Sequence, residues 1–292
     1  DLAGTLTITN GALDVSASNY GITAKSWTDT GAGTFTEGTG TVTFDVAGGT
    51  INSNETFENV TINHAGTTTL GAALDLDDTL TITGGALDVS ASNYGITLKS
   101  FTDSGTGTFT EQSGTVTADI AGGTINSNDD FYNLTINHAG TTTLGGNTSV
   151  TSVLTTTSGT LDASSYTITL SGTTGTPFSN SGTFTASTST VSYTGNNAAG
   201  NTTVTNVIYN NLTLNNSSET FVLSAALDVN DTVTITTGIL DVTASNYGIT
   251  AKSWTDTGAG TFTEQSGTVT FDVAGGTINA NETFNSVTIN HA

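Results

Sequence analysis

Acidic residues are grouped closely enough at two places in the sequence to hold a metal ion. One group is the string DLDD at 75–78 and the other is DVND at 228–231. Ca²⁺ prefers several hard oxygen ligands supplied together by a turn. The Gly-Gly-x-Gly-x-Asp repeat that binds Ca²⁺ in β-rolls is missing, and a solvated acidic turn is the simpler interpretation. We therefore expect no cofactor, and keep Ca²⁺ as the alternative, with the candidate ligands Asp75, Asp77, Asp78, Asp228, Asn230 and Asp231.

Neighbouring carboxylates also suggest acid chemistry. Glycoside hydrolysis needs two carboxyl groups at a set separation, and Glu55 with Glu58 or Asp129 with Asp130 would supply such pairs. Polysaccharide-cleaving β-helices normally bring Arg or Lys to acidic sugars, whereas this chain has three Lys and no Arg. The absence of Cys excludes thiolate catalysis, thiolate metal ligands and disulfides. We therefore expect that the protein is not an enzyme and has no catalytic residues.

The basic residues and the tryptophans recur at fixed positions. An active site gathers different groups at one place and so breaks the symmetry of a repeat. We therefore interpret these residues as surface decoration or turn packing. The recurring sets are Lys25, Lys99 and Lys252; His64, His138 and His291; and Trp27, Phe101 and Trp254.

These positions recur because the chain consists of four copies of one repeat. The string GALDVSASNYGIT occurs at 11–23 and again at 85–97, with variants at 238–250 and 159–169. We divide the chain into repeats 1–74, 75–148, 149–227 and 228–292, all within one continuous solenoid. The third repeat is divergent and carries insertions, and the fourth is about nine residues short of a full unit. The leucines that anchor the four copies are Leu13, Leu87, Leu161 and Leu240.

Within each repeat, apolar and polar residues alternate with a period of two, as in residues 5–9, 41–46 and 60–63. Such alternation places Leu, Ile, Val and Phe on one face of a strand and Thr, Asn or Asp on the other. Threonine is β-branched and suits a pleated surface that meets water. Glycine-rich strings such as NG, GAG and AGG separate the runs and provide turns. The pattern therefore indicates many short strands.

Strand-forming motifs recur at short intervals inside the repeat, as from Val60 to Leu80 and from Leu80 to Phe109. We predict an all-β fold, a right-handed parallel β-solenoid or β-helix, with about three coils per 74-residue repeat. Tandem β-sandwich repeats are the alternative fold, which would need about seven strands in each repeat. Ladders of Thr and Asn should line the outside. The predicted interior of repeat 1 contains Leu6, Ile8, Leu13, Val15, Ile22, Phe35, Val42, Phe44, Ile51, Phe57, Val60, Ile62, Leu70 and Leu74.

Charge and hydropathy limit the partners. The formal net charge is -22, so phosphate contacts with nucleic acid are not expected. The sequence has no run of about 18 apolar residues, so we expect no membrane insertion. Asp1-Leu2 matches 75–76 and His291-Ala292 matches 64–65, and neither end carries a distinct capping sequence. A solenoid without caps exposes unpaired strand edges, so we expect further coils to stack there.

The strings LTITGGALD, GTFTEQSGTVT and FYNLTINHAGTTTL resemble those of large repeat-rich bacterial surface proteins of the filamentous-haemagglutinin and adhesin type. The resemblance covers essentially the whole chain. It implies a β-helical shaft, secretion, an extracellular or cell-surface location, and a role in attachment or matrix.

Together these features predict a structural protein. We expect a repeat segment of an extracellular fibre, which assembles by coil stacking and end-to-end self-association. The alternative is the shaft of a cell-surface adhesin that displays a separate binding domain. The partner is then either a second copy of the chain, in a homopolymer, or the rest of a longer repeat chain.

Overall fold

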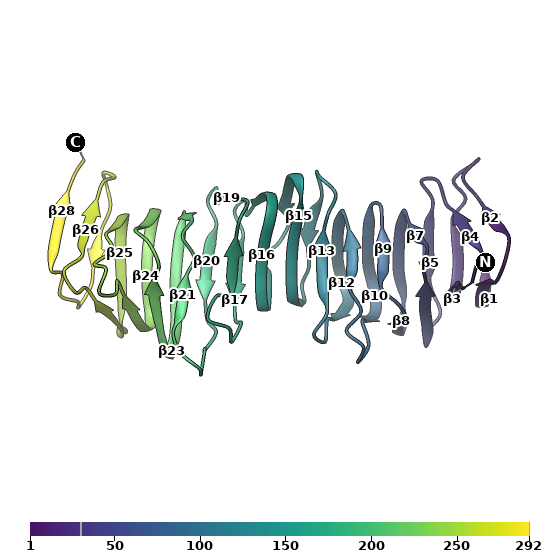
Figure 1. The fold of residues 1–292 in the computed structure, drawn as a ribbon, viewed down its shortest axis with the longest axis horizontal. Coiled ribbons are helices and arrows are strands. Elements are labelled where there is room, and N and C mark those ends of the chain that lie inside the picture. Colours follow the sequence, from purple (N-terminus) through teal and green to yellow (C-terminus); the bar gives the residue numbers. More distant parts are fainter. Residues whose placement is uncertain (30, 292) are drawn as a thin grey trace. The chain divides into compact units, whose positions relative to one another are not determined.

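The computed structural model describes residues 1–29 and 31–291. All the regular elements in this part of the chain are β-strands. The strands pair in parallel with strands about one coil away and stack as a β-solenoid (Figure 1). The prediction of an all-β parallel solenoid is therefore confirmed, and the β-sandwich alternative is wrong. The chain forms two compact units, Asp1–Thr148 and Ser149–Ala292.

Unit 1 contains fifteen of the strands. They are β1 (Leu2–Ile8), β2 (Ala12–Asp14), β3 (Ile22–Asp29), β4 (Thr34–Thr36), β5 (Thr41–Phe44), β6 (Gly49–Ser53), β7 (Thr56–Phe57), β8 (Asn59–Leu70), β9 (Leu74–Leu76), β10 (Thr79–Asp88), β11 (Ile96–Leu98), β12 (Ser100–Thr110), β13 (Thr115–Ala118), β14 (Thr124–Asn126) and β15 (Asp130–Leu144).

Unit 2 contains the other strands, the first of which starts one residue before the unit boundary. They are β16 (Thr148–Asp162), β17 (Thr167–Leu170), β18 (Phe178–Asn180), β19 (Thr183–Thr185), β20 (Thr190–Tyr193), β21 (Thr202–Val204), β22 (Ile208–Tyr209), β23 (Asn211–Leu223), β24 (Leu227–Asp241), β25 (Ile249–Thr263), β26 (Thr268–Phe271), β27 (Ile278–Asn279) and β28 (Ser286–Ile289).

Each coil of unit 1 has three sides. The coil that starts at Val60 places residues 60–62 on the first side, 68–70 on the second and 74–76 on the third, and Leu80 then pairs with Val60. Coil length varies with the turns between the sides. The paired residues Val42 and Val60 are 18 positions apart, whereas the paired residues Phe101 and Ile125 are 24 apart. The coils are therefore shorter than the sequence spacing suggested.

Short coils change how the repeat maps onto the solenoid. Leu6 pairs with Trp27, Trp27 with Ile51, and Ile51 with Leu70, which takes three coils. Leu80, the counterpart of Leu6 in repeat 2, lies two sides beyond Leu70. One repeat therefore takes about three and two-thirds coils, and the chain makes about 14 turns. The predicted number of about three coils per repeat is too low.

In unit 2 the repeat is likewise not a whole number of coils. Val233, the counterpart of Leu154, stands in a column that runs through Leu212 and Val191 to Ile168. Ile168 lies on the third side of the coil that Leu154 begins. Equivalent residues of successive repeats therefore lie on different sides, and each column stacks residues from different positions of the repeat.

The interior holds the alternate, apolar residues of each strand, as predicted. Val42, Phe44, Val60 and Ile62 are at most 2% exposed. The first coil of unit 1 is an exception to the predicted interior, because only one neighbouring coil covers it. Its half-buried residues are Leu6, Leu13, Val15 and Ile22.

An aromatic triad fills the interior of each repeat. Trp27 is fully buried, and its ring centroid lies 4.6 Å from that of Phe35 and 5.2 Å from that of Phe57. The interpretation of Trp27 and its counterparts as surface decoration or turn packing is therefore wrong, because they lie in strands and are fully buried. The alternation of the strand turns Trp27 inward together with Asp29, with Thr28 between them on the outer face. The related triads are Phe101–Phe109–Phe131, Phe178–Phe184–Tyr209 and Trp254–Phe262–Phe284.

The outside carries the predicted threonine ladders. On one side of unit 1, successive coils place one threonine directly over another along Thr23, Thr43, Thr61, Thr81 and Thr102. These residues alternate with the buried apolar ones, so their hydroxyls face solvent. The corresponding ladder in unit 2 consists of Thr169, Ser192, Thr213, Thr234 and Thr255.

Candidate functional site

The first predicted acidic turn does not gather its carboxylates around one point. Thr56 donates a hydrogen bond from Oγ1 to Oδ2 of Asp75, at 3.0 Å. The Nζ of Lys99 lies 3.3 Å from Oδ1 of Asp78. Asp77 is exposed and faces other acids. The three residues therefore have three different sets of partners.

The second predicted turn repeats the ion pair. The Nζ of Lys252 lies 3.3 Å from Oδ1 of Asp231, and both side chains are about a third exposed or more. Asp228 and Asn230 are exposed. Exposed ion pairs contribute about 0–1 kcal/mol. The recurring lysines Lys99 and Lys252 thus each pair with an aspartate of the preceding coil and offset its negative charge.

The structure brings Asp77 together with two acids that were not among the predicted metal ligands. One carboxylate oxygen each from Glu37, Glu58 and Asp77 lies within 4.8 Å of the others. Burial, aided by the charges of Asp77 and Glu58, raises the pKa of Glu37. Burial, aided by the charges of Asp78 and Asp77, raises the pKa of Glu58. The three acids lie on successive coils, one on each. The sequence could have predicted this cluster only if the length of each coil had been known.

Removal and addition of Ca²⁺ test whether any of these carboxylates binds the ion. We expect EDTA to leave the melting temperature unchanged, because three of the predicted ligands, Asp75, Asp78 and Asp231, already have Thr56, Lys99 and Lys252 as partners. The measurement is thermal unfolding by circular dichroism with EDTA and with millimolar Ca²⁺. A rise in melting temperature with Ca²⁺ that disappears in Glu58→Gln would contradict the expectation and identify the three-acid cluster as a calcium site.

Carboxyl groups are also buried inside the solenoid, where none was predicted. Asp29, Asp103 and Asp256 occupy the same repeat position and are at most 5% exposed. Neither carboxylate oxygen of Asp29 has a hydrogen-bond partner. The strand pattern that turns Trp27 inward also turns Asp29 inward, so the alternation of the sequence could have predicted a buried acid at this position.

Two of the buried acids, Asp103 and Asp256, meet a second acid from the next coil. Burial, and then the adjacent carboxyl of Asp129, raise the pKa of Asp103 to about 6. Burial, and then Asp256, raise the pKa of Glu282. The predicted pair Asp129 with Asp130 is therefore not the pair that interacts, because Asp129 faces Asp103 instead. A second carboxyl group nearby thus adds to burial in disfavouring the ionised forms of Asp103 and Glu282.

The histidines close turns. The Nδ1 of His138 accepts a hydrogen bond from the backbone N–H of Gly140 at 2.9 Å, and Nε2 lies 2.8 Å from Oγ1 of the buried Thr142. His64 makes the same two contacts with Gly66 and Thr68. Burial lowers the pKa of His64 and of His138. Both rings act as neutral bridges across the turn.

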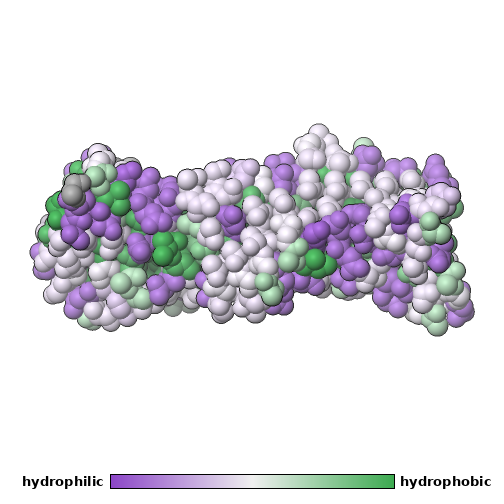
Figure 2. Space-filling view, turned by 90° about the horizontal axis from the view of Figure 1, so that it is seen from above, coloured by the Kyte–Doolittle hydropathy of each residue, from purple (hydrophilic) through white to green (hydrophobic). Residues whose placement is uncertain are grey.

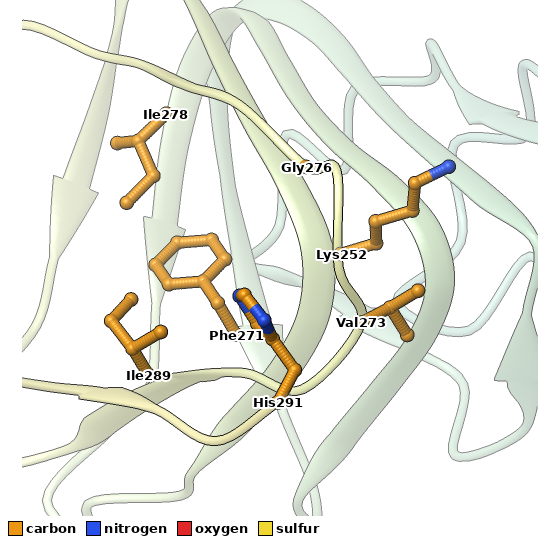
Figure 3. A pocket seen from close by; sticks show the side chains of 7 residues that line it. All are labelled: Lys252, Phe271, Val273, Gly276, Ile278, Ile289 and His291. Carbon is orange, nitrogen blue, oxygen red and sulfur yellow. The ribbon is translucent and has the colours of Figure 1, made fainter.

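The last coil of unit 2 exposes residues that other coils bury. Val287 is 45% exposed and Ile289 is 59% exposed, whereas their counterparts Val60 and Ile62 are 0% exposed. Hydrophobic surface is visible at this end of unit 2 in Figure 2. The same coil forms a shallow pocket, in which Ile278 and Ile289 lie around the ring of Phe271 while the Lys252 chain extends away (Figure 3).

Comparisons with known proteins give no relative: no family model, no curated protein and no solved structure matches the chain. None of the described residues forms a helix long and apolar enough to cross a membrane. The function of the chain is therefore inferred from the solenoid and its exposed strands.

Proposed function

We propose that this chain is a structural segment of an extracellular fibre. The observation that carries the proposal is the parallel solenoid itself, in which strands pair from coil to coil over columns of buried apolar side chains. Coils of this kind add to one another by strand pairing, and we propose the same mode of assembly, coil stacking and end-to-end self-association, for the fibre.

The chemistry of the chain fits a mechanical role. Parallel backbone pairing between coils and columns of buried apolar side chains are the interactions that hold repeat solenoids together. The net charge of -22 opposes lateral clumping of such fibres in water. The resemblance to repeat-rich bacterial surface proteins supports the extracellular location. In the alternative, the chain is a shaft that holds a separate binding domain away from a cell.

Negative-stain electron microscopy of the purified chain tests the proposal. We expect filaments of uniform width at near-physiological salt, where a Debye length of about 8 Å screens the negative charge. Single particles of one chain at every concentration and salt would contradict self-assembly and favour the adhesin shaft. The control is the same chain carrying Val287→Asp, which should remain unassembled.

A further inference from the structure

Two pairs of acidic residues meet in the interior of the solenoid. Asp103 of β12 is 2% exposed and Asp256 of β25 is 5% exposed. Each lies next to an acid of the following coil, which is Asp129 in the first pair and Glu282 in the second. Asp256 and Glu282 are the repeat counterparts of Asp103 and Asp129. A buried carboxylate is strongly disfavoured unless a hydrogen-bond donor or a cation compensates its charge.

No basic group supplies that compensation in the part of the chain that the structure describes. The charged groups that face the first pair are the acids Glu111 and Asp130. The charged group that faces the second pair is Glu264, also an acid. Lys99 and Lys252 pair with aspartates of the preceding coil instead. The compensation must therefore come from a hydrogen bond or from a group that the side chains themselves take up.

The hydrogen bonds of the first pair leave one donor missing. Oδ2 of Asp129 accepts a hydrogen bond from the backbone N–H of Phe109. Both carboxylate oxygens of Asp103 are buried without a hydrogen-bond partner. The nearby backbone N–H of Asn128 opposes the rise in the pKa of Asp103, but it is not aligned for a hydrogen bond. The contact between the two carboxyl groups therefore lacks a hydrogen.

The second pair has the same deficit. Oδ1 of Asp256 accepts a hydrogen bond from the backbone N–H of Gly258 at 2.7 Å. Oδ2 of Asp256 is buried without a partner. Glu282 faces the backbone N–H of Phe262, as Asp129 faces that of the corresponding phenylalanine in repeat 2. In both pairs an oxygen of the buried aspartate therefore meets the second acid with no donor between them.

Repeat 3 lacks both acids together. The neutral Asn180 stands at the place of Asp103. Val207 stands at the place of Asp129, two residues before the aromatic residue of its triad. One acid without the other would leave a carboxyl group in the interior with nothing to accept or to donate its hydrogen bond. The joint replacement therefore indicates that the two acids act as a unit.

From these contacts we infer that each of the two pairs holds one proton, which the carboxyl group of one coil donates to the carboxylate of the next coil. The proton supplies the missing donor and leaves one buried charge instead of two. Two carboxyl groups at one site hold a proton in this way because both cannot ionise together. Release of the proton to water leaves two facing carboxylates, which repel each other. Each pair therefore joins two coils at low pH and loosens them at high pH, whether or not the chain forms a fibre.

For the first pair, burial and Asp129 place the change at about pH 6, because they raise the pKa of Asp103 to about 6 from 3.8. Since the folded-state pKa is raised, the proton's contribution is complete below about pH 3.8 and is lost as the pH rises through about 6. The negative charges of Glu111 and Asp130 add to the loss. The protection of β12 amides against hydrogen exchange should therefore fall about tenfold between pH 5 and pH 7.5.

The variant Asp129→Asn tests whether the proton belongs to the pair. Its amide can donate to the carboxylate of Asp103, so no proton is needed, and the fall in protection should disappear as completely as in Asp103→Asn. The measurement is hydrogen exchange with mass spectrometry, with the rates corrected for the intrinsic effect of pH. The matched control is Asp130→Asn, which removes an exposed acid next to the pair and should keep the fall.

The combination found in repeat 3, Asp103→Asn with Asp129→Val, should also show no fall. It keeps the test decisive if circular dichroism shows that Asp129→Asn does not fold. No fall in the unmodified chain, or a fall that persists in Asp129→Asn, would overturn the shared proton. Millimolar Ca²⁺ that restores protection at pH 7.5 in the unmodified chain but not in Asp103→Asn would also overturn it, because a cation would then join the two carboxylates.

Discussion

Replacing Asp103 with Asn is expected to stabilise the fold at pH 7.5 by on the order of 2 kcal/mol, and to leave its stability at pH 4 nearly unchanged. The buried Asp103 has a pKa raised to about 6, from an ordinary value of 3.8, by burial and by Asp129. Because the folded-state pKa is raised, the protonated carboxyl contributes its full stability below about pH 3.8. That stability is lost as the pH rises through about 6.

Asparagine keeps the shape of the protonated acid and cannot ionise, so it avoids this loss. Its amide also offers a donor to the carboxylate of Asp129. Repeat 3 has the half-buried Asn180 at the corresponding place, where it pairs with Thr156 of the preceding coil. The measurement is thermal unfolding at pH 4 and pH 7.5, supported by hydrogen exchange of the amides in β12. The control is Asp130→Asn, which removes an exposed charge next to Asp129. An equal change at both pH values would contradict the assignment.

Truncation of Trp254 to Ala is expected to destabilise unit 2 by about 3–5 kcal/mol. The indole is fully buried, with its ring centroid 4.8 Å from that of Phe262 and 5.3 Å from that of Phe284. Removal leaves a cavity that β25 cannot easily close, because backbone pairing holds this strand on both edges, to β24 on one and to β26 and β27 on the other. The expected result is early local unfolding of β25 and the coils that follow it.

Trp254→Phe is the matched control and should cost much less. Repeat 2 already places Phe101 at this position, in contact with Phe109 and Phe131 at 5.2 Å each. The indole Nε1 of Trp254 is buried without a hydrogen-bond partner, so its loss offsets part of the lost packing. Urea unfolding followed by circular dichroism compares the two variants. A similar destabilisation by both would show that the triad tolerates no change of shape.

The alternation of residue types decided by itself which side chains point inward. Leu80 and Ile82 are buried while Thr79 and Thr81 face outward, because successive residues of a strand point to opposite faces. The same alternation places Asp29 inside beside Trp27, although acidic residues are rarely buried in a protein core. The parallel solenoid followed from this pattern, from the glycine-rich turns and from the repeat.

Only the tertiary structure decided which strands stack. The turns differ in length, so the coils are unequal and do not divide the repeat evenly. The offset of two-thirds of a coil places Leu80 in the column of Val60 rather than in the column that starts at Leu6. It also brings Glu37, Glu58 and Asp77 together, and sets Asp129 against Asp103. A local pattern fixes the face of a side chain, but the register between coils depends on how each turn closes over the coil before it.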